Sequence, residues 1–500
     1  MDSEAPCARP PSVRARAPAV RLRVAWLRFA PLVLPLVFAM VSFAQLSLID
    51  SGTLTPIWLL PVAELGLCVG FLSWALRRRL PGADRVLLPL VSLLVGLGLA
   101  EVARLAQPAF LLRQMAWLVL GSAALVLVAL GTGNLRWLHR YRYTWLLLGL
   151  FLLSMTLVFG VNPSGSGARL WLGFSGVYFQ PSELLKVLMV VFLASYLAER
   201  RDALREIEIK VGWWRLPHPA YLGPLLLMWG FSVLLLAWQR DLGAGLLFFG
   251  VFLAMLYAAT GQGRYVVAGS ALLALAAVVG YKMFDLVALR VDAWWNPWPD
   301  ASGRSFQIVQ SLLAFASGGV FGQGLGQGLP TAIPVVHTDF VFAAIGEEFG
   351  LAGTMAVLLC MTLLVGRAFH IALRCEREFD RLLAVGIGSL FGLQSLVIVL
   401  GTLKLIPLTG VTLPFVSYGG SSLLVSMVMV GLLLHISGHT EQALSPLGNR
   451  PREKHARQAV SKTGDYRPLV PEAGRCRVAG DYRPLAKTGD YRKTTVSDGC

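Results

Sequence analysis

The run Phe29–Leu48 reads FAPLVLPLVFAMVSFAQLSL and contains no charged residue. A helix needs about 20 apolar residues to cross the roughly 30 Å hydrocarbon layer of a membrane, so this run predicts a membrane-spanning helix. Arginines precede it, as in a secretory signal peptide. The run is nevertheless longer than the apolar region of about 7–15 residues in such peptides, and more apolar runs follow. We therefore interpret it as a retained first span.

The whole chain has the composition of a membrane protein. Its 500 residues are 56% hydrophobic and 14% charged, whereas soluble domains are about a quarter charged. The expected fold class is an all-α integral membrane protein, a polytopic helix bundle. The twelve apolar runs lie at about 30–49, 57–76, 86–105, 110–132, 144–160, 183–197, 219–237, 241–260, 265–283, 341–366, 383–402 and 411–437.

The net charge of +16 lies in the tails and in short loops. That distribution follows the positive-inside rule, and no nucleic-acid-binding fold surrounds the basic residues, so nucleic acid is excluded as a partner. The chain is expected to be a multi-pass plasma-membrane protein with both termini cytoplasmic. The loops expected inside are Arg77–Arg85, Asn134–Tyr143, Glu199–Arg215, Gly261–Arg264 and Arg367–Arg381.

Four regions are expected along the chain. Residues 1–28 form a basic cytoplasmic tail, 29–85 hold two spans, 86–440 form the membrane core, and 441–500 form a second basic tail. The last region carries three copies of Gly-Asp-Tyr-Arg, at 464–467, 480–483 and 489–492. These copies have no apolar face, so we expect a disordered tail, either inert or used for phosphorylation or partner docking.

Two longer segments are expected outside, Val161–Ser182 and Phe284–Phe340. Long loops in compact domains are usually functional, so chemistry is expected at this face. Residues 305–315 predict a helix at the membrane interface or re-entrant into it. The glycines at 318–328 suggest tight turns or close backbone approach rather than a dinucleotide site, because no βαβ unit surrounds them.

Cysteines and histidines do not indicate a metal site. The six cysteines lack CxxC spacing, and His435 and His439 have no third ligand nearby in the sequence.

The segment Pro334–Glu348, PVVHTDFVFAAIGEE, is the first candidate site. Ionisable residues at the edge of an apolar span are costly and usually face a polar cavity, which favours a functional role for Asp339, Glu347 and Glu348. The alternative is that these carboxylates pair with basic residues to hold helices together.

The second candidate contains Arg169, Trp171, Glu183 and Lys186. Ser182 is expected to cap the following helix, which leaves a structural alternative for Glu183. Arg169 and Lys186 together suit a pyrophosphate, which requires positive charge and donors.

Two further segments complete the candidates. Asp241 lies in a charged turn between two spans. The segment Ile406–Ser422 contains two prolines and three glycines and predicts a broken helix, either lining a substrate groove or simply kinked.

These motifs, in this order, resemble the SEDS family (shape, elongation, division and sporulation), which includes RodA, FtsW and SpoVE. The resemblance covers about Val86–Ser437 and rests on QPSELLK at 180–186, DLG at 241–243, HTDF at 337–340, EEFG at 347–350 and PFVSYGGS at 414–421. This chain departs from the family's pattern at Val335, where many relatives have glutamate, and at Arg240, where relatives often have proline.

The resemblance implies a GT-C-like core of ten spans, with the two N-terminal spans as additions. It implies a peptidoglycan glycosyltransferase that polymerises lipid II, the undecaprenyl-pyrophosphate disaccharide-pentapeptide, beside a class B penicillin-binding protein. Asp339 matches the family's critical carboxylate. The expected substrate-binding residues are Arg169, Trp171, Glu183, Lys186, Asp241, His337, Glu347, Ser417 and Ser421.

The hypothesis for the reaction is an inverting displacement in which Asp339 takes a proton from the acceptor sugar hydroxyl. Arg169 and Lys186 would neutralise the pyrophosphate, with a divalent cation (Mg²⁺ or Mn²⁺) as a conceivable aid. The alternatives are a lipid II flippase, in which the acids relay protons, and a non-catalytic scaffold of a cell-wall synthase.

Overall fold

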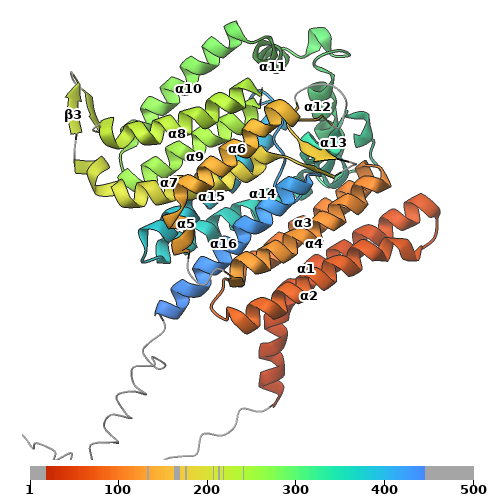
Figure 1. The fold of residues 1–500 in the computed structure, drawn as a ribbon. Coiled ribbons are helices and arrows are strands. Elements are labelled where there is room, and N and C mark those ends of the chain that lie inside the picture. Colours follow the sequence, from red (N-terminus) through yellow and green to blue (C-terminus); the bar gives the residue numbers. More distant parts are fainter. Residues whose placement is uncertain are drawn as a thin grey trace, which may run out of the picture. The chain divides into compact units, whose positions relative to one another are not determined.

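The computed structural model describes residues 18–131, 135–162, 169–174, 177–206, 208–211, 214–217, 219–239 and 241–444. They belong to one compact unit, and the repeat-bearing tail expected after residue 441 lies almost wholly outside them. Helices dominate this part of the chain (Figure 1). The helical polytopic fold class is therefore confirmed.

Each of the twelve predicted apolar runs falls on a helix. Eleven helices within the described residues are long and apolar enough to cross a membrane, and the run at 219–237 is α8. The helices of these runs are α1 (Pro18–Ser51), α2 (Leu59–Arg79), α3 (Leu87–Leu105), α4 (Pro108–Gly131), α6 (Arg142–Phe159), α7 (Pro181–Glu206), α8 (Pro219–Trp238), α9 (Leu242–Thr260), α10 (Gly263–Met283), α14 (Val341–Arg374), α15 (Glu378–Thr402) and α16 (Gly420–Leu444).

Short elements join these helices. They are η1 (Pro56–Trp58), α5 (Arg136–Arg140), β1 (Leu172–Phe174), β2 (Val177–Phe179), β3 (Glu208–Val211), β4 (Trp214–Pro217), α11 (Asp285–Trp295), η2 (Trp298–Asp300), α12 (Phe306–Gly318), η3 (Pro330–Ala332) and α13 (Val336–Asp339). The two strand pairs, β1–β2 and β3–β4, are small antiparallel hairpins. Helix α12 confirms the helix expected at 305–315 and packs on α14.

Two boundaries differ from the prediction. Helix α1 already begins at Pro18, so the expected tail at 1–28 ends within a helix. Helix α7 begins at Pro181, the residue type that starts helices most readily, so Ser182 lies inside its first turn and is not the cap. Gln180, whose carbonyl accepts from Glu183 N at 3.1 Å, is the residue that precedes the helix.

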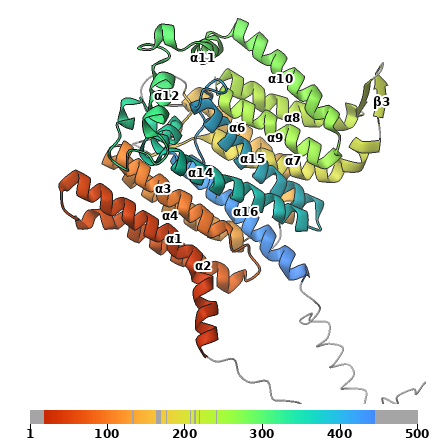
Figure 2. The same cartoon turned by 180° about the vertical axis from the view of Figure 1, so that it is seen from behind.

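The bundle is built from helices that pack along one another in pairs. Helix α16 lies along α4, α15 lies between α14 and α7, and α1 lies along α3 (Figures 1 and 2). Successive helices run in opposite directions, so their junctions gather at two ends. We call the end with α11–α13 and residues 403–419 the loop end, and the opposite end, where α3 begins and α14 finishes, the cation-rich end.

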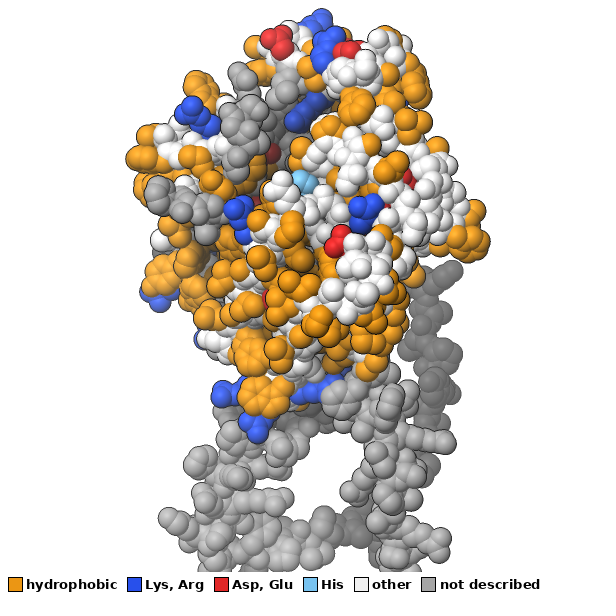
Figure 3. All heavy atoms as spheres, turned by 90° about the vertical axis from the view of Figure 1, so that its right-hand side faces the viewer, with side chains coloured by type: hydrophobic (Ala, Val, Ile, Leu, Met, Phe, Trp, Pro, Cys, Tyr) orange, Lys and Arg blue, Asp and Glu red, His pale blue; other side chains and the backbone are white. Residues whose placement is uncertain are grey.

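One face of the unit shows the surface expected of a membrane protein. Hydrophobic side chains cover much of this face, and Lys and Arg side chains gather at its lower edge (Figure 3). Helix α10 is exposed along almost its whole length, with 6% of its span buried. An apolar helix with so little protein cover requires a lipid environment.

The glycines at 318–328 permit close approach between the loop and α14, as predicted. Helix α14 is interrupted at Gly350, which has φ +66°. Gly324 N donates to Glu348 O at 2.9 Å, and Leu351 N donates to Gly319 O at 3.0 Å, so the loop satisfies the backbone groups released by the interruption. A Cβ at Gly322 would lie 2.2 Å from Glu348 O, so a side chain cannot be accommodated there.

The expected break in the last apolar run is larger than a kink. Residues 403–419 are non-helical, and α16 begins only at Gly420, so the span predicted from 411 starts too early. The segment lies against α3 and α9, where a Cβ at Gly98 would be 2.5 Å from Phe415 O and one at Gly243 would be 2.6 Å from Thr409 O. Protein therefore covers this irregular backbone, as the interior of a membrane requires.

Candidate active site

Asp339 is the last residue of the short helix α13, just before α14 begins. Val335 enters this helix with φ +58°, a conformation that is rare for a β-branched residue. Strain of this kind is retained where the surrounding structure fixes the backbone, which is common at functional sites. Asp339 is thus held at the loop end of the bundle, outside the span that follows.

The surroundings of Asp339 favour its neutral form. Burial raises the pKa of Asp339 to about 6, although the Thr338 hydrogen bond and the charge of Arg290 both lower it. A carboxyl group with this pKa is mostly ionised at pH 7 and can still accept a proton effectively. Asp339 therefore has the electrostatic character of a general base.

Arg290 of α11 is the cation that faces Asp339. A Cβ placed on Gly410 would lie 3.6 Å from Asp339 Oδ2 and 3.9 Å from Arg290 Nη2, so the glycine lies beside both charged groups. Arg290 Nη1 also donates to Thr409 O at 3.3 Å. Burial lowers the pKa of Arg290, while the charges of Asp339 and Asp241 raise it.

The non-helical segment 403–419 holds the HTDF motif by hydrogen bonds. Ser417 Oγ donates to Thr338 O at 2.6 Å and accepts from Leu413 N at 2.9 Å. Tyr418 N donates to His337 O at 2.8 Å. The hydroxyl of Ser417 is therefore already used in fixing the backbone on the N-terminal side of Asp339.

His337 lies in an aromatic cluster beside this backbone. Its ring centroid is 5.3 Å from that of Phe110 and 5.7 Å from that of Tyr418. Burial lowers the pKa of His337, so the imidazole is neutral at pH 7. A neutral imidazole offers one donor and one acceptor to a sugar without adding charge.

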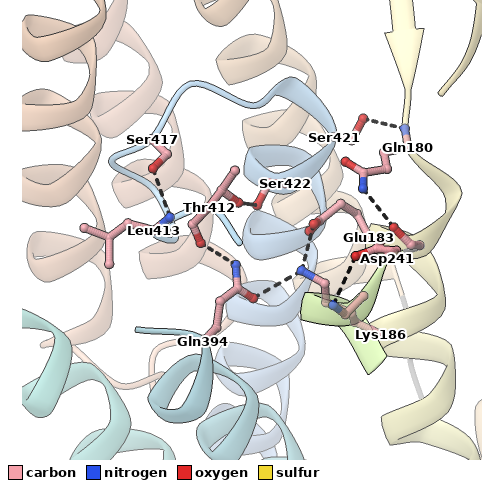
Figure 4. Close-up of polar contacts among 12 residues, drawn as sticks. Gln180, Glu183, Lys186, Asp241, Gln394, Thr412, Leu413, Ser417, Ser421 and Ser422 are labelled. Atoms are coloured by element: carbon pink, nitrogen blue, oxygen red, sulfur yellow. Dashed lines mark hydrogen bonds and ion pairs between the residues drawn. The ribbon is translucent and has the colours of Figure 1, made fainter. Parts of the chain in front are cut away.

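A second polar group surrounds Lys186 on α7 (Figure 4). Lys186 Nζ forms an ion pair with Glu183 Oε1 at 2.7 Å and donates to Gln394 Oε1 at 3.3 Å. Gln394 Nε2 donates to Thr412 O at 2.8 Å, which connects the group to the non-helical segment. The side chain of Lys186 is 2% exposed, so its charge is compensated inside the protein.

Asp241 lies between these two groups. It caps α9, with Oδ1 accepting from Ala244 N at 3.1 Å, while Oδ2 is buried without a hydrogen-bond partner among the described residues. Burial raises the pKa of Asp241 and the charge of Lys186 lowers it, while the charge of Asp241 in turn raises the pKa of Arg290. Asp241 thus links the Lys186 group electrostatically to Arg290 and Asp339.

Ser421 belongs to the same region. Its hydroxyl accepts from Gln180 N at 2.9 Å, which ties the start of α7 to the start of α16 (Figure 4).

The remaining candidates lie in different settings. Arg169 is exposed, and Trp171 pairs with Val161 in a β-bridge, both on the loop before α7. Glu347 is buried, and its Oε1 accepts from Leu329 N at 2.8 Å. Glu348 forms an ion pair with Arg104 at 3.1 Å, which is the helix-locking alternative considered from the sequence.

The described part of the chain does not offer a metal site built from protein ligands alone. No group of three or more His, Cys, Asp or Glu side chains within the described ranges could hold a metal ion. The charged partner of Asp339 is instead the guanidinium of Arg290.

Sequence reasoning missed Arg290 and Gln394. Arg290 lies in the long segment expected outside, Phe284–Phe340, where its charge was a signal, but nothing in the sequence pairs it with Asp339. Gln394 is a polar residue in the apolar run of α15, with 2% of its surface exposed, and buried polar residues in spans are usually functional or paired.

The fold and this arrangement define a class, that of polytopic helical membrane proteins with a half-buried acid–arginine site at one end of the bundle. Residues 85–442 match the family of FtsW, RodA and SpoVE, described as cell cycle proteins. The chain belongs to this SEDS family.

Several relatives are similar over most of their length. The chain is 38% identical to the peptidoglycan glycosyltransferase RodA of Mycobacterium tuberculosis, over 85% of this chain and 93% of that protein. It is also 38% identical to the probable peptidoglycan glycosyltransferase FtsW of Geobacter sulfurreducens, over 66% of this chain and 85% of that protein.

Solved structures show the same fold. A chain from a structure titled for the coordination of polymerization and crosslinking by a peptidoglycan synthase complex is 32% identical, with a TM-score of 0.60, covering 72% of this chain and 99% of that one. The rod-shape-determining protein RodA of Thermus thermophilus is 29% identical with a TM-score of 0.51, covering 71% of this chain and 96% of that one.

Proposed function

We propose that this protein is a peptidoglycan glycosyltransferase that polymerises lipid II into glycan strands. Relatives named for this activity are 38% identical over most of the chain. The observation that carries the assignment is Asp339, a half-buried carboxylate with a pKa of about 6 that faces Arg290 at the loop end. Such a group can accept the proton of a sugar hydroxyl near neutral pH.

Asp339 is the proposed general base. In chain elongation the 4-hydroxyl of the acceptor sugar attacks the anomeric carbon of a donor that carries a lipid pyrophosphate. Asp339 takes the hydroxyl proton as the new glycosidic bond forms and the bond to pyrophosphate breaks. A positioned base contributes roughly 10²–10⁴-fold to such a step. A single displacement inverts the α-linked donor to a β product.

Arginine and lysine side chains are proposed to receive the pyrophosphate. Arg290 lies nearest to Asp339, and exposed Arg169 is on the neighbouring loop. Lys186 keeps the role expected from its motif, but phosphate would have to replace Glu183 as its partner, since the two form a 2.7 Å ion pair. Preorganised cations stabilise charge that develops on a leaving group.

The other motif residues are proposed to shape the substrate groove. His337 and Trp171 offer ring faces to a sugar, while Ser417, Ser421 and Asp241 hold the backbone around Asp339 and Lys186. Glu347 holds Leu329 in the loop that precedes α13.

The loop end is proposed to face outward. The basic loops at the cation-rich end then lie in the cytoplasm together with both termini, as the positive-inside rule requires. A class B penicillin-binding protein is the proposed partner, because the similar chain of 32% identity comes from a peptidoglycan synthase complex. A duty in cell elongation is favoured over division, since the 442-residue match to RodA extends beyond the family core whereas the FtsW match covers 331 residues.

Purified full-length protein with labelled lipid II tests this proposal. Wild-type protein is expected to form glycan strands, and Asp339→Asn is expected to lose at least about 100-fold of the rate. Asp300→Asn is the matched control, because Asp300 is a carboxylate in the same outer segment that pairs with Arg304 at the surface.

The outcome also separates the alternatives. Equal polymerisation by Asp339→Asn would refute the catalytic assignment. Movement of lipid II across vesicles without strand formation would favour a flippase, and activity seen only as stimulation of a partner enzyme would favour a scaffold.

A further inference from the structure

A pair of buried carboxylates lies away from the proposed active site, on α3 and α14. Glu101 is fully buried, and the side chain of Glu348 has no exposed surface. Neither carboxyl oxygen of Glu101 has a hydrogen-bond partner among the described residues, and neither does Oε2 of Glu348. The two groups are close enough to repel each other when both are ionised.

One cation is available to this pair. Arg104 Nε donates to Glu348 Oε1 at 3.1 Å, while its Nη2 donates to Gly328 O at 3.0 Å. Glu347, the neighbouring acid, is occupied by the N–H of Leu329 at 2.8 Å. With both members of the pair ionised, one negative charge would be uncompensated in the interior.

An uncompensated charge of this kind is costly in a protein interior and more costly in a membrane. A carboxylate avoids that cost by binding a proton. A metal ion is a poor alternative here, because the described residues contain no group of three or more ligands that could hold one.

We propose that Glu101 and Glu348 form a proton-binding site in which one proton is shared by the pair while Arg104 stays with Glu348 and Gly328. The site acts on the glycine-rich segment 318–329. Arg104 donates to Gly328 O, and Glu347 accepts from Leu329 N, so both side chains fix the end of this segment. Those residues lead directly into η3 and α13. Loss of the proton would draw Arg104 towards Glu101 and weaken this attachment. The inference does not depend on the proposed enzymatic activity.

Dicyclohexylcarbodiimide tests the proposal on the purified full-length protein. This apolar reagent adds a protonated carboxylic acid across a C=N bond and leaves a stable N-acylurea on the side chain. Mass spectrometry of wild-type peptides at pH 7 is expected to find the adduct on Glu101. Glu199, which is half-exposed and paired with Arg142 at 2.7 Å, is expected to stay unmodified.

Variants sharpen the test. In Glu348→Gln, Arg104 becomes available to Glu101, which then ionises, so modification of Glu101 is expected to fall several-fold. Glu378→Gln, which removes a carboxylate paired with Arg201 at the other end, is the matched control and is expected to leave it unchanged. Equal modification in Glu348→Gln would contradict a shared proton.

Infrared spectroscopy covers the case in which the reagent fails to reach the site. The carbonyl band of a protonated carboxylic acid is expected in wild type and lost in Glu101→Gln, which keeps the shape of the neutral group and is expected to fold and melt like wild type. Absence of both the adduct and the band at pH 7 would overturn the proposal. Suppression of the adduct by sodium chloride but not by choline chloride would overturn it in favour of a sodium site.

Discussion

The carboxylates that join helices at the cation-rich end have more partners than Asp339 and Asp241 have at the loop end. At the cation-rich end, Asp84 accepts from Arg367 Nε at 2.9 Å and from Val86 N at 2.8 Å, and Glu199 pairs with Arg142 at 2.7 Å. At the loop end, the side chains of Asp339 and Arg290 both lie next to Gly410. Oδ2 of Asp241 has no hydrogen-bond partner within the described ranges. Acids that are fully paired hold helices together, and acids left underpaired keep their affinity for protons.

The difference follows from what each end connects. Asp84 joins three helices, since its carboxylate binds Arg367 of α14, its own N–H donates to Ser437 of α16 at 3.0 Å, and it precedes α3. The loop end is instead built from short elements and irregular backbone.

The largest effect is expected from removing the cation beside Asp339. Arg290→Gln is expected to lower the polymerisation rate by about 100-fold, because charge on the base and leaving group loses its partner. It is also expected to move the acid limb of the pH–rate profile above pH 6, since the Arg290 charge lowers the pKa of Asp339. Rates with labelled lipid II measure both. Arg304→Gln, on the exposed ion pair with Asp300, is the control and is expected to match wild type.

The pH dependence of wild-type protein is expected to give the next effect. Asp339 must be ionised to accept a proton, and its pKa is about 6, so activity rises with pH through that value. At pH 5 the rate is expected to be about tenfold below its plateau. Burial lowers the pKa of His337, so its imidazole titrates at lower pH than a free imidazole. A profile that is flat between pH 5 and 7 would show that Asp339 is not the titrating base.

The same substitution at the two ends is expected to change stability in opposite directions. The folded-state pKa of Asp339, about 6, exceeds its ordinary value of 3.8, so the folded protein binds the proton more tightly and loses stability as pH rises through about 6. Asp339→Asn removes this cost and is expected to stabilise the protein by ~1–3 kcal/mol at pH 7.5.

Asp84→Asn is expected to destabilise the protein by about 2–3 kcal/mol, because Arg367 and the first N–H groups of α3 lose a charged acceptor that is 4% exposed. Melting temperatures in one detergent compare the two variants. A loss of stability in both would contradict the view that Asp339 is held at an energetic cost.

The sequence predicted the helices better than the site, for a physical reason. Hydrophobic runs report burial or lipid contact, and each of them overlaps a helix. Hydrophobicity also predicted that the last span begins at residue 411, before its actual start at Gly420. Residues 411–417 are apolar because they are buried in protein, although they are not helical. Asp339 was identified from its motif and from the energetic cost of placing an ionisable residue at the edge of a span. Its partner Arg290 was not, since their proximity depends on how α11, α13 and Gly410 come together.

The smallest effect is expected at the surface of the cation-rich end. Glu199 pairs with Arg142 and lies 3.6 Å from His139, but its side chain is 40% exposed. Water screens such pairs, so Glu199→Gln is expected to cost less than about 1 kcal/mol of stability. Polymerisation by this variant is expected to equal that of wild type. A tenfold loss would mean that charge at this end is coupled to the site through α7, the helix that also carries Lys186, and the two ends would then have to be regarded as one system.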